Sequence, residues 1–232
     1  MARISAMTDA KLTDEGRDRV SAAVAAVERH TAGEVVTIVT NQSDDYAEIA
    51  LLWSAFVAFL ALAVLALFPD FYLGIYDRLT GGWVQQWQPR GVFAVALVVA
   101  VVKFTGMWLL QLWRPLRLFL VPGPVKHHRV RARAITCFKV GAERRTHGRT
   151  GILIYLSMAE RRAEIVADET IAAKVAPEVW GDAMAAMLAH IRDGRVADGM
   201  VAAIGKVGEV LAVHMPIAEG DTNELPDRLI EV

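Results

Sequence analysis

Three carboxylates border short apolar segments of this chain. Glu34 opens the segment EVVTIVT at 34–40, while Glu164 and Asp168 stand within and just after a later segment at 163–166. Hard cations such as Ca²⁺ and Mg²⁺ prefer clustered carboxylate oxygens. If the segments pair as strands, the sequence predicts a metal site at these acids, and Ca²⁺ or Mg²⁺ is the only cofactor it indicates.

Arginines beside the same segments could add an anion-binding role to this metal site. Arg149, Arg161 and Arg162 flank the apolar run and could contact a phosphate or an acidic partner group. A metal at Glu34 and Asp168 with Arg162 orienting phosphate would make a metal-dependent phosphohydrolase. The same acids could equally pair with these arginines or cap neighbouring helices, so a structural role stays open.

Positive signatures of catalysis are missing from the sequence. It contains no phosphate-binding P-loop, no HExxH helix and no Gly-x-Ser-x-Gly elbow. The single cysteine, Cys137, excludes an intrachain disulfide. The formal net charge of −1 gives no general argument for binding nucleic acid. We therefore expect a protein that is more a binding module than an enzyme and that takes no nucleic-acid partner.

Two long apolar segments, 49–68 and 91–113, dominate the middle of the chain. Each is long enough to cross a hydrocarbon core of about 30 Å as a helix. The aromatic connection at 69–90 is expected to lie as a loop at the headgroup level. Lys103 is the single charge inside the two segments, and it either faces another subunit or snorkels towards an interface.

A basic stretch follows the second apolar segment. Its excess of positive charge predicts a cytoplasmic side by the positive-inside rule, and hence a multi-pass protein of a bacterial inner membrane with both termini in the cytoplasm. Beside a membrane, such charge favours contact with anionic lipids over nucleic acid. The residues concerned are Arg114, Arg117, Lys126, Arg129, Arg131 and Arg133.

The remaining sequence alternates helical and strand patterns around the apolar pair. Neither flank alone offers enough apolar surface, so the strand before the pair should join the strands after it, which requires an even number of spans between them. The predicted fold is α/β, a small layered sheet flanked by helices and interrupted by a transmembrane hairpin. We expect a helix at 13–29 with Thr13 as N-cap, strands at 34–40, 151–158 and 163–166, and helices at 125–141, 169–175, 179–193 and 196–213.

Five stretches of the chain resemble the TPM domain family, specifically its bacterial membrane-protein branch. They are HTAGEVVTIV at 30–39, RTGILIYLSMAERRAEIVADETI at 149–171, the helix with Trp180, GMVAAIGKVGEVLAVHMP at 199–216 and NELPDRLIEV at 223–232. The departure from many relatives is the hairpin inserted after the first strand. The chain then divides into 1–48, the hairpin 49–113 and 114–232.

The resemblance implies a central sheet flanked by helices and no single common activity. Some relatives look like metal-binding phosphatases, and others like accessory or repair factors of large membrane complexes. Our interpretation is a membrane-anchored, non-enzymatic accessory, assembly or quality-control subunit of a membrane protein complex. A divalent-metal phosphatase at the cytoplasmic membrane surface is the alternative.

Overall fold

The computed structural model describes residues 12–81, 88–141, 150–217 and 228–232. The chain forms two compact units. The first, here called the sheet unit, comprises Met1–Asp44 and Gly123–Val232, and the second, the hairpin unit, is Asp45–Pro122. In the sequence, the hairpin unit therefore interrupts the sheet unit.

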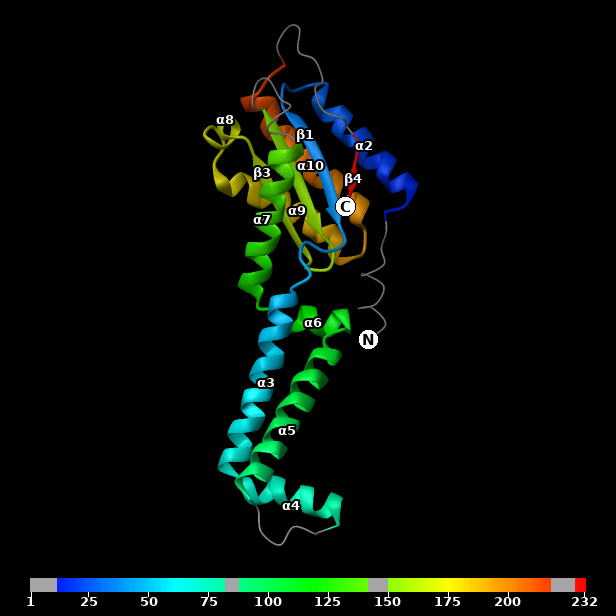
Figure 1. Cartoon of the computed structure of the whole chain (residues 1–232). Helices are drawn as coiled ribbons and strands as arrows, with labels where there is room; N and C mark the ends of the chain where they lie inside the picture. The colour runs from blue at the N-terminus through cyan, green and yellow to red at the C-terminus, as the bar shows by residue number, and fades with distance from the viewer. Residues whose placement is uncertain (1–11, 82–87, 142–149, 218–227) are drawn as a thin grey trace. The chain divides into compact units, whose positions relative to one another are not determined.

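A mixed sheet of four strands forms the centre of the sheet unit (Figure 1). Its spatial order is β3-β2-β1-β4. Strand β1 runs parallel to β2 in a register from Glu34 opposite Gly151 to Thr40 opposite Ser157, which confirms the expected pairing across the hairpin. Strand β3 is antiparallel to β2, and β4 is parallel to β1. The strands are β1 (Glu34–Thr40), β2 (Gly151–Ser157), β3 (Arg162–Ala167) and β4 (Ile230–Glu231).

Three helices cover one face of the sheet: α2 (Asp14–Glu28), α9 (Pro177–Arg192) and α10 (Val196–His214). Alternate residues of the strands point into this layer, since side chains along a strand alternate between the faces. Ile152, Ile154 and Leu156 are fully buried there. Thr13 caps α2 as predicted, because its Oγ1 accepts the Gly16 N–H at 3.1 Å.

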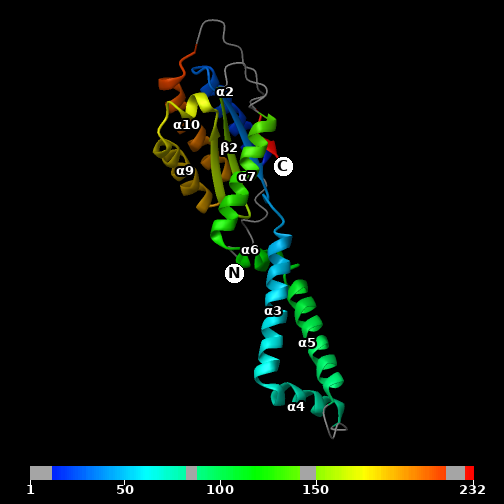
Figure 2. The same cartoon turned by 60° about the vertical axis from the view of Figure 1, so that its left-hand side comes forward.

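The opposite face is covered by one helix, α7 (Gly123–Gly141), and Figure 2 shows α7 on one side of the sheet with α9 and α10 on the other. A smaller apolar cluster lies between α7 and the strands. It consists of Val36, Ile38, Val130, Ala134, Phe138, Leu153 and Tyr155. The short helix α8 (Glu169–Ala172) follows β3.

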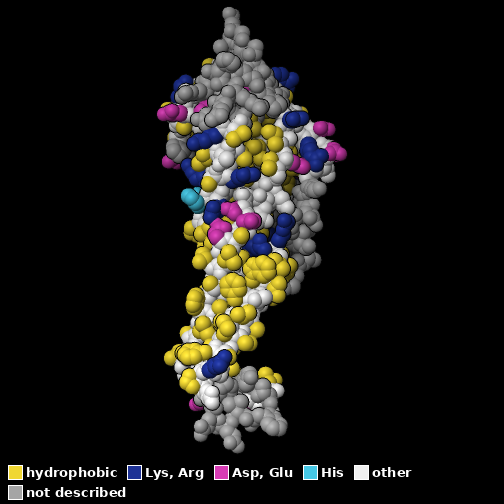
Figure 3. All heavy atoms as spheres, in the orientation of Figure 1, with side chains coloured by type: hydrophobic (Ala, Val, Ile, Leu, Met, Phe, Trp, Pro, Cys, Tyr) yellow, Lys and Arg dark blue, Asp and Glu magenta, His cyan; other side chains and the backbone are white. Residues whose placement is uncertain are grey.

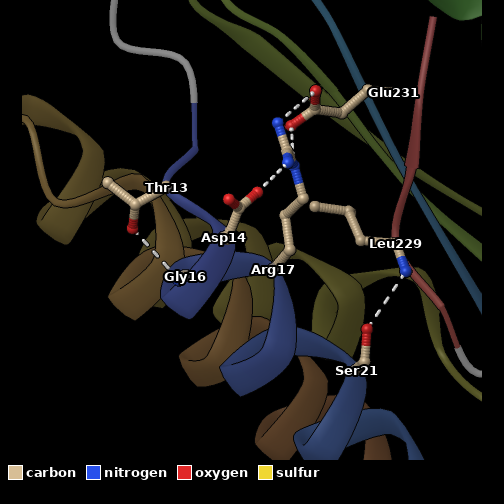
Figure 4. A network of polar contacts seen from close by, with 7 residues as sticks. All are labelled: Thr13, Asp14, Gly16, Arg17, Ser21, Leu229 and Glu231. Carbon is tan, nitrogen blue, oxygen red and sulfur yellow. Dashed lines mark hydrogen bonds and ion pairs between the residues drawn. The ribbon is translucent and has the colours of Figure 1, made fainter.

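The C-terminal strand β4 is held to α2 by polar contacts (Figure 4). Arg17 donates to the carboxylate of Glu231 at 3.0 Å and also pairs with Asp14. The Leu229 N–H donates to Ser21 Oγ at 3.3 Å. The sequence pattern predicts no strand here, because two residues are too few for an alternation of side chains to register.

The hairpin unit contains two long helices, α3 (Ala47–Leu67) and α5 (Pro89–Leu110), close to the predicted segments. Both are long and apolar enough to cross a membrane. Small residues line the buried stripe of α3, which lets two helices approach closely. The small residues are Ala50, Ser54, Ala58 and Ala61, and the larger Leu65 completes the stripe.

The connection between these helices differs from the predicted loop at 69–90. It contains a helix, α4 (Pro69–Thr80), which begins with a proline in its first turn and ends at Gly81 in the left-handed conformation, φ 84°. Proline in the first turn and glycine after the last turn favour a helix. The loop was predicted from the aromatic composition of this segment, which does not distinguish a loop from a helix. Trp83 and Trp87 lie outside the described residues. A second helix that we did not expect, α6 (Arg114–Leu120), follows α5.

Candidate functional site

Glu164 on β3 is a buried carboxylate under α7, with 5% of its surface exposed. Its Oε1 lies 3.3 Å from Nδ1 of His127, and its Oε2 lies 3.6 Å from a guanidinium nitrogen of Arg131. His127 and Arg131 are one helical turn apart, so both reach the same side of α7. One carboxylate thus joins β3 to two basic groups of the covering helix.

The charges of this ion-pair cluster differ in burial, because Glu164 is buried and its two basic partners are exposed. The pKa of Glu164 is raised because burial disfavours the charged carboxylate, and the positive charges of His127, Arg131 and Arg162 oppose that shift. The side chains of His127 and Arg131 are 54% and 62% exposed. Both carboxylate oxygens are already engaged, so the arrangement favours a structural ion pair over metal ligation at Glu164.

Glu34 and Asp168 lie at the same end of the sheet, on opposite sides of β2. Glu34 is opposite Gly151 in the β1–β2 register, and the Asp168 N–H donates to the Gly151 carbonyl at 3.0 Å. Two buried acids therefore flank a residue that has no side chain. Arg149, another predicted contact residue, lies outside the described residues.

The other members of the predicted site are distributed along β3. Glu164 stands four residues before Asp168, about 13 Å away at the rise of a strand. Arg162 is six residues before Asp168, about 20 Å away, and it donates to the Gly123 carbonyl at 3.2 Å. Arg161 is exposed in the turn before β3, with a φ of 53°. The structure thus places Glu34 and Asp168 at the same end of the sheet, and Glu164, Arg161 and Arg162 further from that end.

A polar cluster that the sequence analysis did not identify surrounds Glu160 in the β2–β3 turn. The buried Glu160 carboxylate accepts the Ser43 N–H at 3.0 Å and the hydroxyl of Ser157. Ser43 Oγ in turn lies 3.0 Å from the hydroxyl of Tyr155, whose pKa is raised by burial. These contacts fasten the chain leaving β1 to the turn. The sequence pattern does not predict the burial of Glu160, because an acid in a turn is ordinarily exposed to solvent.

A second group of acids follows β1 in the sequence. Asp44, Asp45 and Glu48 offer oxygens within 4.8 Å of one another and could hold a metal ion. Asp44 also pairs with Arg129 at 3.3 Å. This acidic group, which the sequence analysis overlooked, supports the Ca²⁺ or Mg²⁺ prediction only in its general form.

Several of the predicted basic residues make contacts within their own units. In the hairpin unit, Arg117 donates to the Gln111 carbonyl at 2.9 Å, while Arg114 is exposed. The other four residues lie on α7 of the sheet unit. There Arg129 and Arg131 pair with acids, Arg133 is exposed, and burial and the charge of Arg162 lower the pKa of Lys126.

Gln111 joins the two long helices of the hairpin unit. Its side chain is fully buried, and its Nε2 donates to the Ala50 carbonyl at 3.0 Å and to Ser54 Oγ at 3.2 Å. Trp53 adds a contact at the same end, since its indole N–H donates to the Leu120 carbonyl at 3.1 Å. Directed polar contacts therefore fix one end of the hairpin, and small residues pack the rest.

The outer surface of the hairpin is apolar, as the visible face in Figure 3 shows. The most apolar stretch of α5 has only 6% of its residues buried, against 28% for α3. Lys103 is exposed on α5. The exposed large side chains of α5 include Phe93, Leu97, Val98, Val101, Val102, Trp108, Leu109 and Leu110.

A mixed sheet with one helix on one face and three on the other, interrupted by a helical hairpin, defines the class of this protein as α/β. The TPM domain family matches residues 126–210, which carry most of α7, strands β2 and β3 and the helices after them. This match at residues 126–210 confirms the resemblance to the TPM domain family noted in the sequence.

A solved structure agrees with this fold. The NMR structure of the BA42 protein from the psychrophilic bacterium Bizionia argentinensis is similar to this chain with a TM-score of 0.54 and 16% sequence identity. The similarity covers 95% of each chain. At this identity the likeness establishes the fold alone. None of the curated proteins matches the chain.

Proposed function

We propose that this protein is a membrane-anchored TPM domain that acts as a non-enzymatic accessory, assembly or quality-control subunit of a membrane protein complex. The observation that carries the proposal is the hairpin unit. It presents two helices of membrane-crossing length whose large apolar side chains are exposed. Water would make such a surface strongly unfavourable, whereas lipid and membrane-embedded partners would cover it.

The basic residues give this anchor an orientation. Six lie in α6 and in α7 as far as Arg133, while the stretch from α4 to the first turn of α5 carries only Arg78 and Arg90. By the positive-inside rule, the sheet unit and both termini are then in the cytoplasm of a bacterial cell, with the hairpin in the inner membrane. Exposed basic groups such as Arg114 and Arg133 would meet anionic lipids there.

Membrane extraction and thiol labelling test the anchor and its orientation. The full chain should remain with the membrane in alkaline carbonate. In a Cys137→Ser background, Gln85→Cys should react with an impermeant thiol reagent in intact spheroplasts, and Thr136→Cys should react only after lysis. Release by carbonate would refute the anchor, and the opposite labelling would refute the orientation.

The accessory role needs a separate measurement. Purification from native membranes in mild detergent, followed by quantitative mass spectrometry, should recover a membrane protein in a fixed ratio to this chain. Recovery of the chain alone, at native expression and after cross-linking, would contradict the role.

The paired acids at the sheet edge favour one second candidate, a divalent-metal phosphatase. Glu34 and Asp168 lie on either side of Gly151 at the same end of the sheet, and carboxylates are the ligands that Mg²⁺ and Ca²⁺ prefer. The purified chain should then hydrolyse a generic phosphomonoester only with Mg²⁺ or Ca²⁺. Glu34→Ala and Asp168→Ala should abolish the activity, while Asp182→Ala, an exposed acid on α9, should not. Equal activity in all variants would eliminate the candidate.

A further inference from the structure

Lys103 is the one charged residue in the interior of the two long helices. Its side chain is exposed on α5, whose exposed side chains also include the apolar Val101, Val102 and Trp108. We propose that Lys103 forms an ion pair, at membrane depth, with an Asp or Glu on a transmembrane helix of another protein that docks on α5. This inference rests on the proposed function, since it requires the hairpin to be in a membrane.

The depth of Lys103 argues against snorkelling. Lys103 lies seven residues before the end of α5 and fourteen after its start, or about 10 Å and about 21 Å along the axis. Side chains of a helix lean towards its N-terminus, so Lys103 leans towards the more distant end. The C-terminal end of α5 is the nearer one and is marked by the exposed Trp108 and Trp113. The Lys103 side chain is expected to point away from that end.

The chain itself supplies no acid at this depth. Within α3 the only acid is Glu48, in the first turn, and α5 contains none. A second copy in the same orientation would bring its own Lys103 to the same depth, which adds a like charge. A helix of a different protein is the source of carboxylate that fits, because an isolated charge in hydrocarbon is unfavourable until it is paired.

The surface beside Lys103 is open enough for a helix. A Cβ atom built on Gly106, one turn further along α5, would meet nothing within 4 Å. A glycine at such a position lets another helix approach closely. The partner is then expected to carry its carboxylate within an otherwise apolar span.

A membrane-permeant carbodiimide tests the contact directly in native membranes that contain the full chain. The reagent activates the partner carboxyl as an O-acylisourea. The uncharged amine of Lys103, after losing its proton, attacks the acyl carbon to form an amide, and the substituted urea leaves. Mass spectrometry should find Lys103 joined to an Asp or Glu within an apolar segment of another protein.

Three variants separate charge from packing. Lys103→Arg keeps the charge and should retain the partner while losing the covalent link. Lys103→Leu should lose the link and reduce the partner recovered in mild detergent by about tenfold, equivalent to ~1.4 kcal/mol. Val102→Leu, on the neighbouring exposed position, should change neither.

Each outcome decides the matter. A link to a carboxylate outside an apolar segment, a link to a second copy, or no link in the wild-type chain overturns the proposal. Undiminished recovery of the partner with Lys103→Leu also overturns it. If these results appear while the chain still resists carbonate extraction, only the Lys103 contact fails; if the chain is extracted, the membrane anchor fails as well.

Discussion

The two faces of the sheet are built in different ways. The face under α2, α9 and α10 is a continuous apolar layer in which the strand residues are fully buried. The face under α7 has a small apolar cluster that includes Tyr155 and, beside it, the buried Glu164. A single helix and an ion pair hold the second face, whereas three helices hold the first.

This difference indicates where the sheet unit is rigid and where it can change. Burial of apolar area dominates stability, so the three-helix face should hold the strands together. Polar contacts add little net stability when their partners are half exposed, so α7 should be the least firmly held helix of the sheet unit. A domain of this kind would respond to a partner through α7.

A cavity under the three-helix face should have the largest effect. Ile154→Ala removes a fully buried side chain that faces α9 and α10, and it should lower the free energy of unfolding by about 3–4 kcal/mol. Chemical denaturation of the full chain in detergent, followed by circular dichroism, measures this. A loss below about 1 kcal/mol would mean that this face is loosely packed.

The matching cavity under α7 should have a smaller effect. Leu153→Ala removes an equally buried side chain at the adjacent position of β2, but α7 can shift towards the sheet and reduce the cavity that is left. We expect a loss of about 2 kcal/mol in the same measurement. Equal losses for Leu153→Ala and Ile154→Ala would remove the distinction between the faces.

Breaking the ion pairs of α7 should have an effect of about 1 kcal/mol. The double variant His127→Ala, Arg131→Ala leaves the buried Glu164 without its two cations, and the exposure of both cations reduces the loss from that expected for a fully buried pair. Hydrogen exchange should quicken in α7 more than in α10. The exposed pair Lys206–Glu209 on α10 is the control, and its removal should leave exchange in both helices unchanged.

The smallest effect concerns pH. Because the folded pKa of Glu164 is raised, the folded chain binds more protons than the unfolded chain just above the ordinary carboxyl pKa. The stability contributed by this group should therefore fall as pH rises through the folded pKa. Glu164→Gln should flatten that part of the profile relative to the wild-type chain. A profile that rises there, or that the variant leaves unchanged, would contradict the assignment to Glu164.

Much of the fold could be predicted because its signals are local. The β-branched residues of β1, the N-cap Thr13 and the length of the apolar helices each act within a few residues. Pairing of β1 with β2 also followed, because neither flank could form a core alone. β4 could not be predicted from periodicity, because it has only two residues. Their position depends on pairing with β1 and on the contact of Arg17 with Glu231.

The candidate site was less predictable because it depends on register. Sequence proximity grouped Glu164 with Asp168, yet four residues along a strand separate them by about 13 Å. Glu34 and Asp168 share one end of the sheet because both are neighbours of Gly151, which no spacing in the sequence reveals. Likewise, the contact of Glu160 with Ser43 joins residues that are far apart in the chain.

The parallel pairing of β1 with β2 also constrains the order of biosynthesis. Strand β1 ends at Thr40, but its neighbour begins only at Gly151. At about 5–20 residues per second, β1 must wait roughly 5–20 s for that partner to emerge from the ribosome. The hairpin is made within this interval, so it is complete before the sheet can close. The nascent strand would meanwhile expose its backbone edges, and we expect it to depend on a chaperone during that time.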